Sequence, residues 1–149
     1  MSTPRVSKIT ESACLRSFKI AFDTGMRTGE ILGLTWEDIT RETILVERAM
    51  VKRELTSPKT HKIRTVFINE ELAAILANHP RRFAGGPVFR DQNGNQRRET
   101  KKYLADWTAA LKKCRMTYRR PYTCRHTRAS EMLMAGVEPA FAAKQLGHD

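Results

Sequence analysis

Cysteine, acidic residues and long apolar runs are all scarce in this chain. Its three cysteines, Cys14, Cys114 and Cys124, are an odd number and form no Cys-x-x-Cys pair, which favours free, mostly buried thiols in a reducing compartment. Cys124 and His126 lack a second pair of ligands at zinc spacing, which argues against a metal site. No run approaches the ~20 apolar residues that cross a bilayer, and no signal peptide is evident. We therefore expect a cytoplasmic protein with no membrane segment and no bound metal.

The shortage of acidic residues leaves the chain strongly positive. Lysine and arginine number 27 against 16 aspartates and glutamates, so the formal net charge is +11 and the isoelectric point is near 10.1. This balance indicates a polyanionic partner, with nucleic acid ahead of a membrane surface. A basic protein without such a partner is the alternative. With 149 residues and 40% hydrophobic content, the chain is long enough for one globular domain.

Hydrophobic periodicity predicts a mainly helical α+β domain. Residues 43–51 are rich in β-branched and apolar side chains and indicate a strand, with 64–68 as its antiparallel partner in one small sheet. Leu133 and Met134 are expected to face the core, and residues 1–7 to form a flexible lead-in. Helices are expected over 9–22, after Gly29, after Asn69, after Thr100, and twice within 121–149.

Four basic side chains suit the handling of a phosphodiester. Arg27 lies in a turn between two glycines, Lys59 in a polar loop, Arg125 at the start of a predicted helix, and His148 near the last residue. A phosphate under in-line attack gathers charge on its non-bridging oxygens, which planar guanidinium groups bind through two parallel hydrogen bonds. A lysine can protonate the leaving oxygen, and a histidine can add a hydrogen bond. Each residue alone is weak evidence, because most arginines of a basic protein are solvated.

Taken together, the segments that hold these residues resemble the catalytic domain of tyrosine recombinases, the phage-integrase family. The family's first catalytic arginine corresponds to Arg27 within TGMRTGEILGLTWEDI, where Glu30 is a supporting carboxylate. The β-hairpin with the catalytic lysine corresponds to SPKTHKIRTVFI and to Lys59. The second arginine and the later histidine correspond to Arg125 in YTCRHTRAS and His148 in AGVEPAFAAKQLGHD. The resemblance covers nearly the whole chain and implies the family's DNA breaking-rejoining fold.

The resemblance also implies a reaction. A tyrosine would cleave one DNA strand to give a 3′-phosphotyrosyl link and a free 5′-hydroxyl, and the hydroxyl of another strand would reverse the step without metal or high-energy cofactor. Arg27 and Arg125 would hold the scissile phosphate, Lys59 would protonate the leaving oxygen, and His148 would bond the phosphate. The expected partner is double-stranded DNA, and the expected activity is that of a prophage or mobile-element integrase.

The chain departs from the family pattern at the nucleophile. The family's tyrosine follows the Gly-His segment, whereas Tyr103, Tyr118 and Tyr122 all precede Arg125. We therefore expect residues 1–149 to form a catalytic domain without the N-terminal core-binding domain and without the C-terminal tyrosine segment. Such a fragment is expected to be inactive and monomeric, whereas the full-length parent would assemble as a tetramer on paired sites.

Other positions carry weaker expectations. Tyr122 stands where many members have histidine; a phenol with a pKa near ~10 donates a hydrogen bond to phosphate but is a poor proton acceptor. His126 is expected to orient Arg125 or to fill a buried polar position, and Arg128 is either a DNA contact or an arginine at the core's edge. Lys62 is the rival of Lys59 for the lysine role. The candidate DNA contacts are Lys62, Arg64, Lys112, Lys113, Arg119, Arg120 and Arg128.

Two further functions stay open at the level of sequence. The first is a non-catalytic DNA-binding module that retains only the phosphate clamp. The second is a basic interaction protein, such as an RNA-binding domain, in which the motif match is accidental.

Overall fold

The computed structural model describes residues 4–57 and 63–148. The elements, in chain order, are α1 Pro4–Thr24, α2 Thr28–Leu32, the 3-10 helix η1 Trp36–Asp38, β1 Thr43–Val46, β2 Ala49–Val51, β3 Glu54–Thr56, β4 Arg64–Phe67, α3 Glu70–Ala77, the 3-10 helix η2 Arg82–Ala84, α4 Thr100–Lys113, α5 Thr123–Met134 and α6 Pro139–Leu146. The expected mainly helical α+β fold is confirmed. None of the helices in these ranges is long and apolar enough to cross a membrane.

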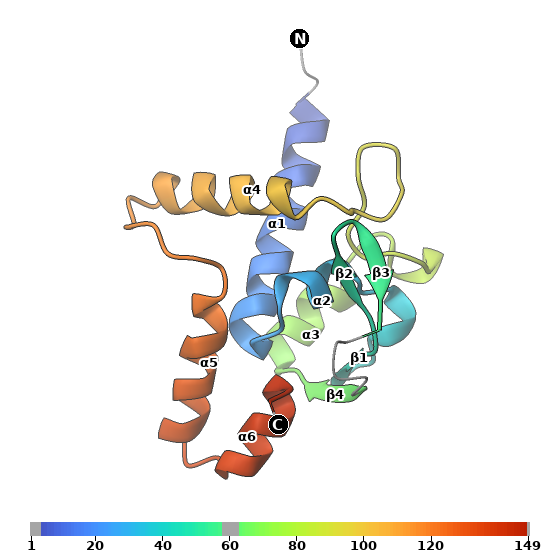
Figure 1. Ribbon diagram of the computed structural model, residues 1–149. Coiled ribbons are helices and arrows are strands. Elements are labelled where there is room, and N and C mark those ends of the chain that lie inside the picture. The colour runs from blue at the N-terminus through green and yellow to red at the C-terminus, as the bar shows by residue number, and fades with distance from the viewer. Residues whose placement is uncertain (1–3, 58–62, 149) are drawn as a thin grey trace.

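Helix α1 is the central element of the fold and contacts α2, α3, α4 and α5 (Figure 1). It already begins at Pro4, so the expectation of a flexible lead-in over 1–7 is wrong from that residue onward. Phe18 of α1 meets two rings of α4 edge-on, with centroids 5.5 Å away at Tyr103 and 4.9 Å away at Trp107. The free thiols of Cys14 and Cys124 are buried in this region, and that of Cys114 is exposed.

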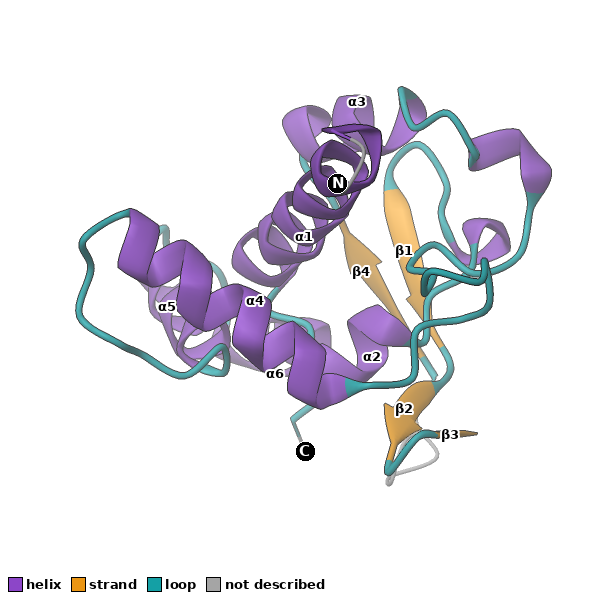
Figure 2. Cartoon of the chain, turned by 90° about the horizontal axis from the view of Figure 1, so that it is seen from above, coloured by secondary structure: helices purple, strands orange, loops and turns teal. Residues whose placement is uncertain are grey.

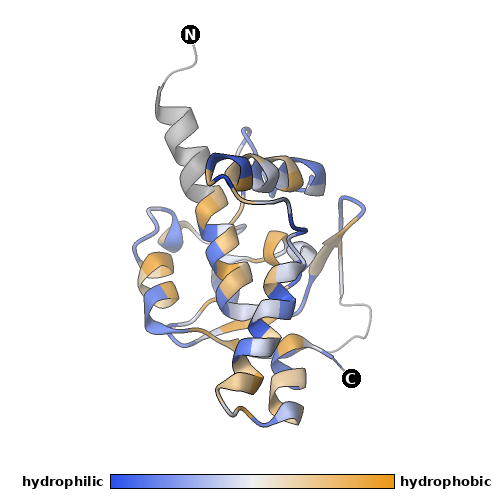
Figure 3. Cartoon of the chain, turned by 90° about the vertical axis from the view of Figure 1, so that its left-hand side faces the viewer, coloured by the Kyte–Doolittle hydropathy of each residue, from blue (hydrophilic) through white to orange (hydrophobic). Residues whose placement is uncertain are grey.

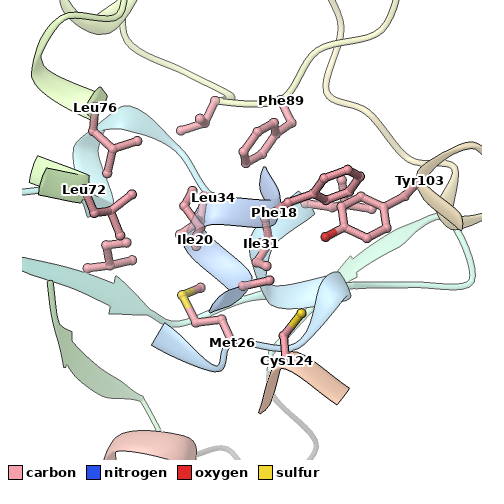
Figure 4. Packing of buried hydrophobic residues seen from close by; sticks show 14 of the residues in the cluster. Phe18, Ile20, Met26, Ile31, Leu34, Leu72, Leu76, Phe89, Tyr103 and Cys124 are labelled. Atoms are coloured by element: carbon pink, nitrogen blue, oxygen red, sulfur yellow. The ribbon is translucent and has the colours of Figure 1, made fainter. Parts of the chain in front are cut away.

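The core joins the two chain segments that carry the arginines of interest. Figure 4 shows Met26, from the turn after α1, in the same cluster as Ile31 of α2 and Cys124 of α5. All three side chains are almost completely buried. Burial of this kind contributes roughly 1.5–3 kcal/mol for each large apolar side chain. The packing therefore fixes the neighbours Arg27 and Arg125 relative to one another.

Two separate strand pairs replace the single sheet expected from the sequence. The expected pairing of β1 with β4 is confirmed, with Thr43 opposite Phe67 and Val46 opposite Arg64. Strands β2 and β3 form a second antiparallel pair, set apart from the first in Figure 2. Their turn has two left-handed residues, Lys52 and Arg53, with φ of 48° and 69°. Such a turn usually contains Asn-Gly, so Lys-Arg gave no hairpin signal.

Helices α5 and α6 form a hairpin whose buried side differs from the expected one. Leu133 is 51% exposed and Met134 is 88% exposed, whereas Cys124 and Met132 are buried. The expectation for Leu133 and Met134 was wrong because residues eight apart, 124 and 132, define the stripe that faces the core. In Figure 3 the ribbon has the colours of apolar residues where α5 leads into α6. Helix α5 packs on α1, and α6 packs on α5 and β4.

Candidate functional site

Arg27 lies in a turn flanked by Gly25 and Gly29, and a side chain at either glycine would collide with a neighbouring element. A Cβ atom on Gly25, whose φ is +68°, would lie 2.6 Å from the side chain of Leu146 in α6. A Cβ on Gly29 would lie 2.6 Å from the backbone oxygen of Met50 in β2. The turn therefore packs closely against both α6 and β2. The side chain of Arg27 remains 42% exposed.

Glu30 is the buried carboxylate that organises this turn. Its side chain is 3% exposed. It accepts a hydrogen bond from the backbone N–H of Arg27 at 2.9 Å and from Nη1 of Arg27 at 3.2 Å. Both terminal nitrogens of Arg64 also donate to it, at 2.9 and 2.8 Å. Burial alone would raise the pKa of Glu30, but the bonds and charge of Arg64, followed by those of Arg27, hold it below its usual value.

Arg125 lies in the first turn of α5 and is 2% exposed. Its Nη1 donates to the backbone oxygen of Gly25 at 3.0 Å, which attaches α5 to the Arg27 turn. Its Nε and Nη2 are buried, and no described residue accepts a hydrogen bond from either nitrogen. Burial, and then the nearby charge of Arg27, lower the pKa of Arg125. A buried cation with two unmet donors is costly by itself and favours the arrival of an anion.

His148 reaches the same place from α6. Gly147 ends the helix in the left-handed conformation, with φ of +72°, and the N–H of His148 donates to the oxygen of Ala143 at 2.9 Å. Burial lowers the pKa of the exposed imidazole, and so do the positive charges of Arg125, Arg27, His126 and Arg64, in that order. The structure therefore gathers Arg27, Arg125 and His148 from three distant segments into one cationic site.

Of the remaining site candidates, the structure describes Tyr122 and His126. Tyr122 precedes α5, is 44% exposed, and meets the ring of His126 edge-on at 4.9 Å. His126 is exposed, so the expectation that it fills a buried polar position is wrong. Lys59 and Lys62 lie outside the described residues. No group of three or more histidine, cysteine or acidic residues that could hold a metal occurs in the described ranges.

The candidate DNA contacts divide into exposed residues and one buried residue. Lys112, Lys113, Arg119 and Arg120 are exposed at the end of α4 and in the connection to α5. Arg64 is not a surface residue: its side chain is 7% exposed, and all three of its guanidinium nitrogens are bonded within the protein. The expectation that Arg64 contacts DNA is therefore wrong.

Arg128 and Gln145 complete the surroundings of the site. The stem of Arg128 lies close to Gly25, and its guanidinium pairs with Glu131 at 3.6 Å, which places it at the core's edge with one face toward solvent. Gln145 of α6 is buried, and sequence reasoning missed it. Its amide accepts from the N–H of Phe67 at 3.0 Å and donates to the oxygen of Thr65 at 3.1 Å, so it covers the open edge of β4.

We expect the imidazole of His148 to titrate below the usual histidine value of ~6.5 in the free chain and closer to it when DNA is bound. The surrounding cations disfavour the imidazolium ion, and a phosphate would offset them. Because the folded state binds this proton less readily than the unfolded state, the contribution to stability is present above the usual value and is lost as the pH falls. Ring-proton NMR titrations measure the pKa of His148 in the free chain and in the presence of a DNA duplex.

His79 is the internal control for this titration. Burial, and then the charges of Arg16, Arg81 and Arg90, lower its pKa to about 4, and none of these groups belongs to the site. Its titration should be the same with and without DNA. An imidazole of His148 that titrates normally and ignores DNA would contradict the geometry described here.

Comparison with protein families gives a match over nearly the whole chain. The model of the phage integrase family matches residues 2–149. Prophage integrase IntR of Escherichia coli strain K12 is 32% identical, over 89% of this chain and 39% of its own length. A XerC-like tyrosine recombinase of Caldanaerobacter subterraneus is also 32% identical, over 88% of this chain and 41% of its own length. The chain thus spans about two fifths of the length of these relatives.

Solved structures show the same fold. The integrase of transposon Tn1549, in complex with a circular-intermediate DNA, superposes with a TM-score of 0.75 at 21% identity, over 99% of this chain and 52% of that one. The XerA recombinase superposes with a TM-score of 0.76 at 20% identity, over 94% of this chain and 49% of that one. At these identities the likeness establishes the fold, and it says nothing about the role of individual site residues.

Proposed function

Because the chain belongs to the phage integrase family, we propose that it is the phosphate-holding part of the catalytic domain of a site-specific tyrosine recombinase. The proposed substrate is double-stranded DNA, bound at the cationic site formed by Arg27, Arg125 and His148. The formal charge of +11 agrees with a polyanionic substrate. The proposed parent is an integrase of a prophage or mobile element, acting in the cytoplasm as a tetramer on paired DNA sites.

The observation that carries this proposal is the state of Arg125. A guanidinium that is 2% exposed, beside two other cationic side chains and with Nε and Nη2 unbonded among the described residues, is arranged for an anion and not for stability. Phosphate oxygens match these two nitrogens in spacing and charge. Arg27 is more exposed and would close on the phosphate from the solvent side.

The roles follow from the chemistry of each group. Arg27 and Arg125 would stabilise the charge that develops on the non-bridging oxygens, and His148 would add a hydrogen bond. Lys59 would protonate the leaving 5′ oxygen. No tyrosine follows Arg125 in these 149 residues, and Tyr103 is completely buried. The proposed role of these residues is therefore to hold the phosphate.

The same cationic site supports a second candidate function, because the buried Arg125 with two nitrogens unbonded among the described residues suits binding as well as catalysis. This candidate is a DNA-binding module that keeps the clamp without the reaction. The two candidates differ in one observable, the formation of a covalent protein–DNA adduct. Arg27 and Arg125 serve both.

We expect this chain to bind duplex DNA with an affinity that falls with salt, and to form no covalent adduct with a nicked suicide duplex. The logarithm of the binding constant should fall by about 0.9 for each phosphate contact per tenfold rise in salt. Arg27→Ala should weaken binding more than Arg41→Ala, which removes an equal charge from an exposed residue outside the site. Fluorescence anisotropy measures the affinities, and a denaturing gel detects the adduct.

Two outcomes would count against the proposal. Equal losses from Arg27→Ala and Arg41→Ala would mean that binding is diffuse and that the clamp is not used. A covalent band that disappears in Tyr122→Phe would assign the nucleophile to this chain.

A further inference from the structure

Arg64 bonds to both of the chain segments that bring phosphate-binding groups to the site. It is the first residue of β4, and its side chain is 7% exposed. Its two terminal nitrogens grip the two oxygens of Glu30 at 2.9 and 2.8 Å. Its remaining nitrogen, Nε, donates to the backbone oxygen of Gln145 in α6 at 3.0 Å. One planar group thus connects the carboxylate beside Arg27 to the end of the helix that precedes His148.

The contact with Glu30 controls the placement of Arg27. The same carboxylate accepts the backbone N–H and Nη1 of Arg27, at 2.9 and 3.2 Å. With both oxygens held by Arg64, the carboxylate has a fixed plane and therefore offers Arg27 one orientation. A lysine in place of Arg64 would keep the charge but could not hold both oxygens and the oxygen of Gln145 at once.

The contact with α6 controls the placement of His148. The backbone of Gly147 lies flat against the Arg64 guanidinium: a Cβ added there would lie 2.8 Å from Nη1, 2.9 Å from Cζ and 3.1 Å from Nε. Gln145 adds two hydrogen bonds between α6 and β4. Figure 1 shows the end of α6 beside β4. The turn at 147–148 is therefore built on the face of Arg64.

We propose that Arg64 is a positioning residue, which sets Arg27 and His148 in one common arrangement for the phosphate. The inference rests on the proposed function, because it assigns a role toward the DNA phosphate held by that site. Arg64 itself is enclosed and is not proposed to touch the DNA. Its contribution passes through Glu30 on one side and through Gly147 on the other.

A double-mutant cycle on the full 149-residue chain tests this role. In the wild-type background, His148→Ala is expected to weaken binding of a short DNA duplex roughly tenfold, the value of a charge-assisted hydrogen bond. In an Arg64→Lys background the same substitution should cost only about twofold, because the imidazole is no longer held in place. Arg27→Ala should show the same reduced cost. Additive effects of Arg64→Lys with both substitutions would overturn the proposal.

Arg97→Lys is the matched control for Arg64→Lys. Arg97 is also a buried arginine paired with a carboxylate, but that carboxylate is Asp106 of α4, at 2.6 Å. If Arg64→Lys acted only by destabilising the fold, Arg97→Lys would reduce the cost of His148→Ala by a similar factor. The proposal expects Arg97→Lys to leave the cost of His148→Ala at its wild-type value.

Gly147→Ala provides a second route, because its added methyl would press on the face of the Arg64 guanidinium, 2.8 Å from Nη1. It should reduce the cost of His148→Ala more than that of Arg27→Ala, because His148 adjoins the altered residue. Gly136→Ala carries the same left-handed strain, with φ of +79°, but its added methyl meets nothing within 4 Å, so both costs should stay unchanged. If Gly147→Ala and Gly136→Ala behave alike, Arg64 does not position His148. An Arg125→Met variant that binds DNA as tightly as the wild-type chain would instead refute the proposed function itself.

Discussion

Replacing Arg125 by methionine is expected to leave the folded chain at least as stable as before while removing most of its affinity for DNA. The substitution removes a buried cation, two of whose donors have no partner among the described residues, and retains most of the side-chain volume. The loss of one bond to Gly25 offsets part of the gain, so the free energy of unfolding should stay level or rise by up to about 1 kcal/mol. The DNA affinity should fall at least about tenfold, because a charge-assisted bond to phosphate is lost.

Arg64→Met is the matched control for this experiment. Both arginines are buried, but Arg64 has a bonded partner at every guanidinium nitrogen. Its removal leaves Glu30 buried with only Arg27 as counter-ion, so the free energy of unfolding should fall by about 3–5 kcal/mol. Denaturant unfolding followed by circular dichroism compares the two variants directly. If both arginines proved equally stabilising, Arg125 would be a structural residue and its unmet donors would have no bearing on a ligand.

Glu30→Ala is expected to be the most destabilising single substitution at the site. It leaves the buried Arg64 without its carboxylate and frees the backbone N–H of Arg27, at a cost of about 3–5 kcal/mol. Because the pKa of Glu30 is held below its usual value, this contribution is present above the usual carboxyl range and is lost as the pH falls through the lowered value. The difference in unfolding free energy between wild type and variant should therefore shrink in acid.

The partner variant Glu30→Leu with Arg64→Met tests the origin of this cost. Replacing both buried ions by apolar side chains should restore most of the stability, since the penalty comes from a charge left alone. Asp38→Ala is the comparison: Asp38 is equally buried, but its partner Arg48 is 27% exposed and can turn to water. Its cost should be clearly smaller. A double variant as unstable as Glu30→Ala would show that the loss comes from packing.

The features that depend on a residue's immediate neighbours can be predicted from the sequence. The glycines around Arg27 indicated a tight turn, and the structure shows that a side chain at either would collide with α6 or β2. Asn69 was expected to cap a helix, and it accepts the N–H of Leu72 at 2.8 Å.

Sequence reasoning failed where a role depends on a distant partner. The sequence places Arg64 among the candidate DNA contacts, whereas the fold brings Glu30 and Gln145 to its guanidinium. One signal was present: Arg64 and Val66 share a face of β4, and that face is buried. For His126, the alternative of a buried polar position beside Arg125 is wrong, because neighbouring positions on a helix point in directions about 100° apart. No sequence pattern predicts that Gln145 covers the edge of β4.

The most direct test of the clamp is an NMR titration of nitrogen-15 labelled arginine side chains with a short DNA duplex at low salt. The account predicts that the Nε–H signals of Arg27 and Arg125 and the ring signals of His148 shift together and saturate at one common affinity. The Nε–H signal of Arg97 should not move, since this arginine is buried against Asp106. Shifts confined to Arg119 and Arg120, with Arg125 unchanged at saturation, would contradict the claim that these residues hold a DNA phosphate.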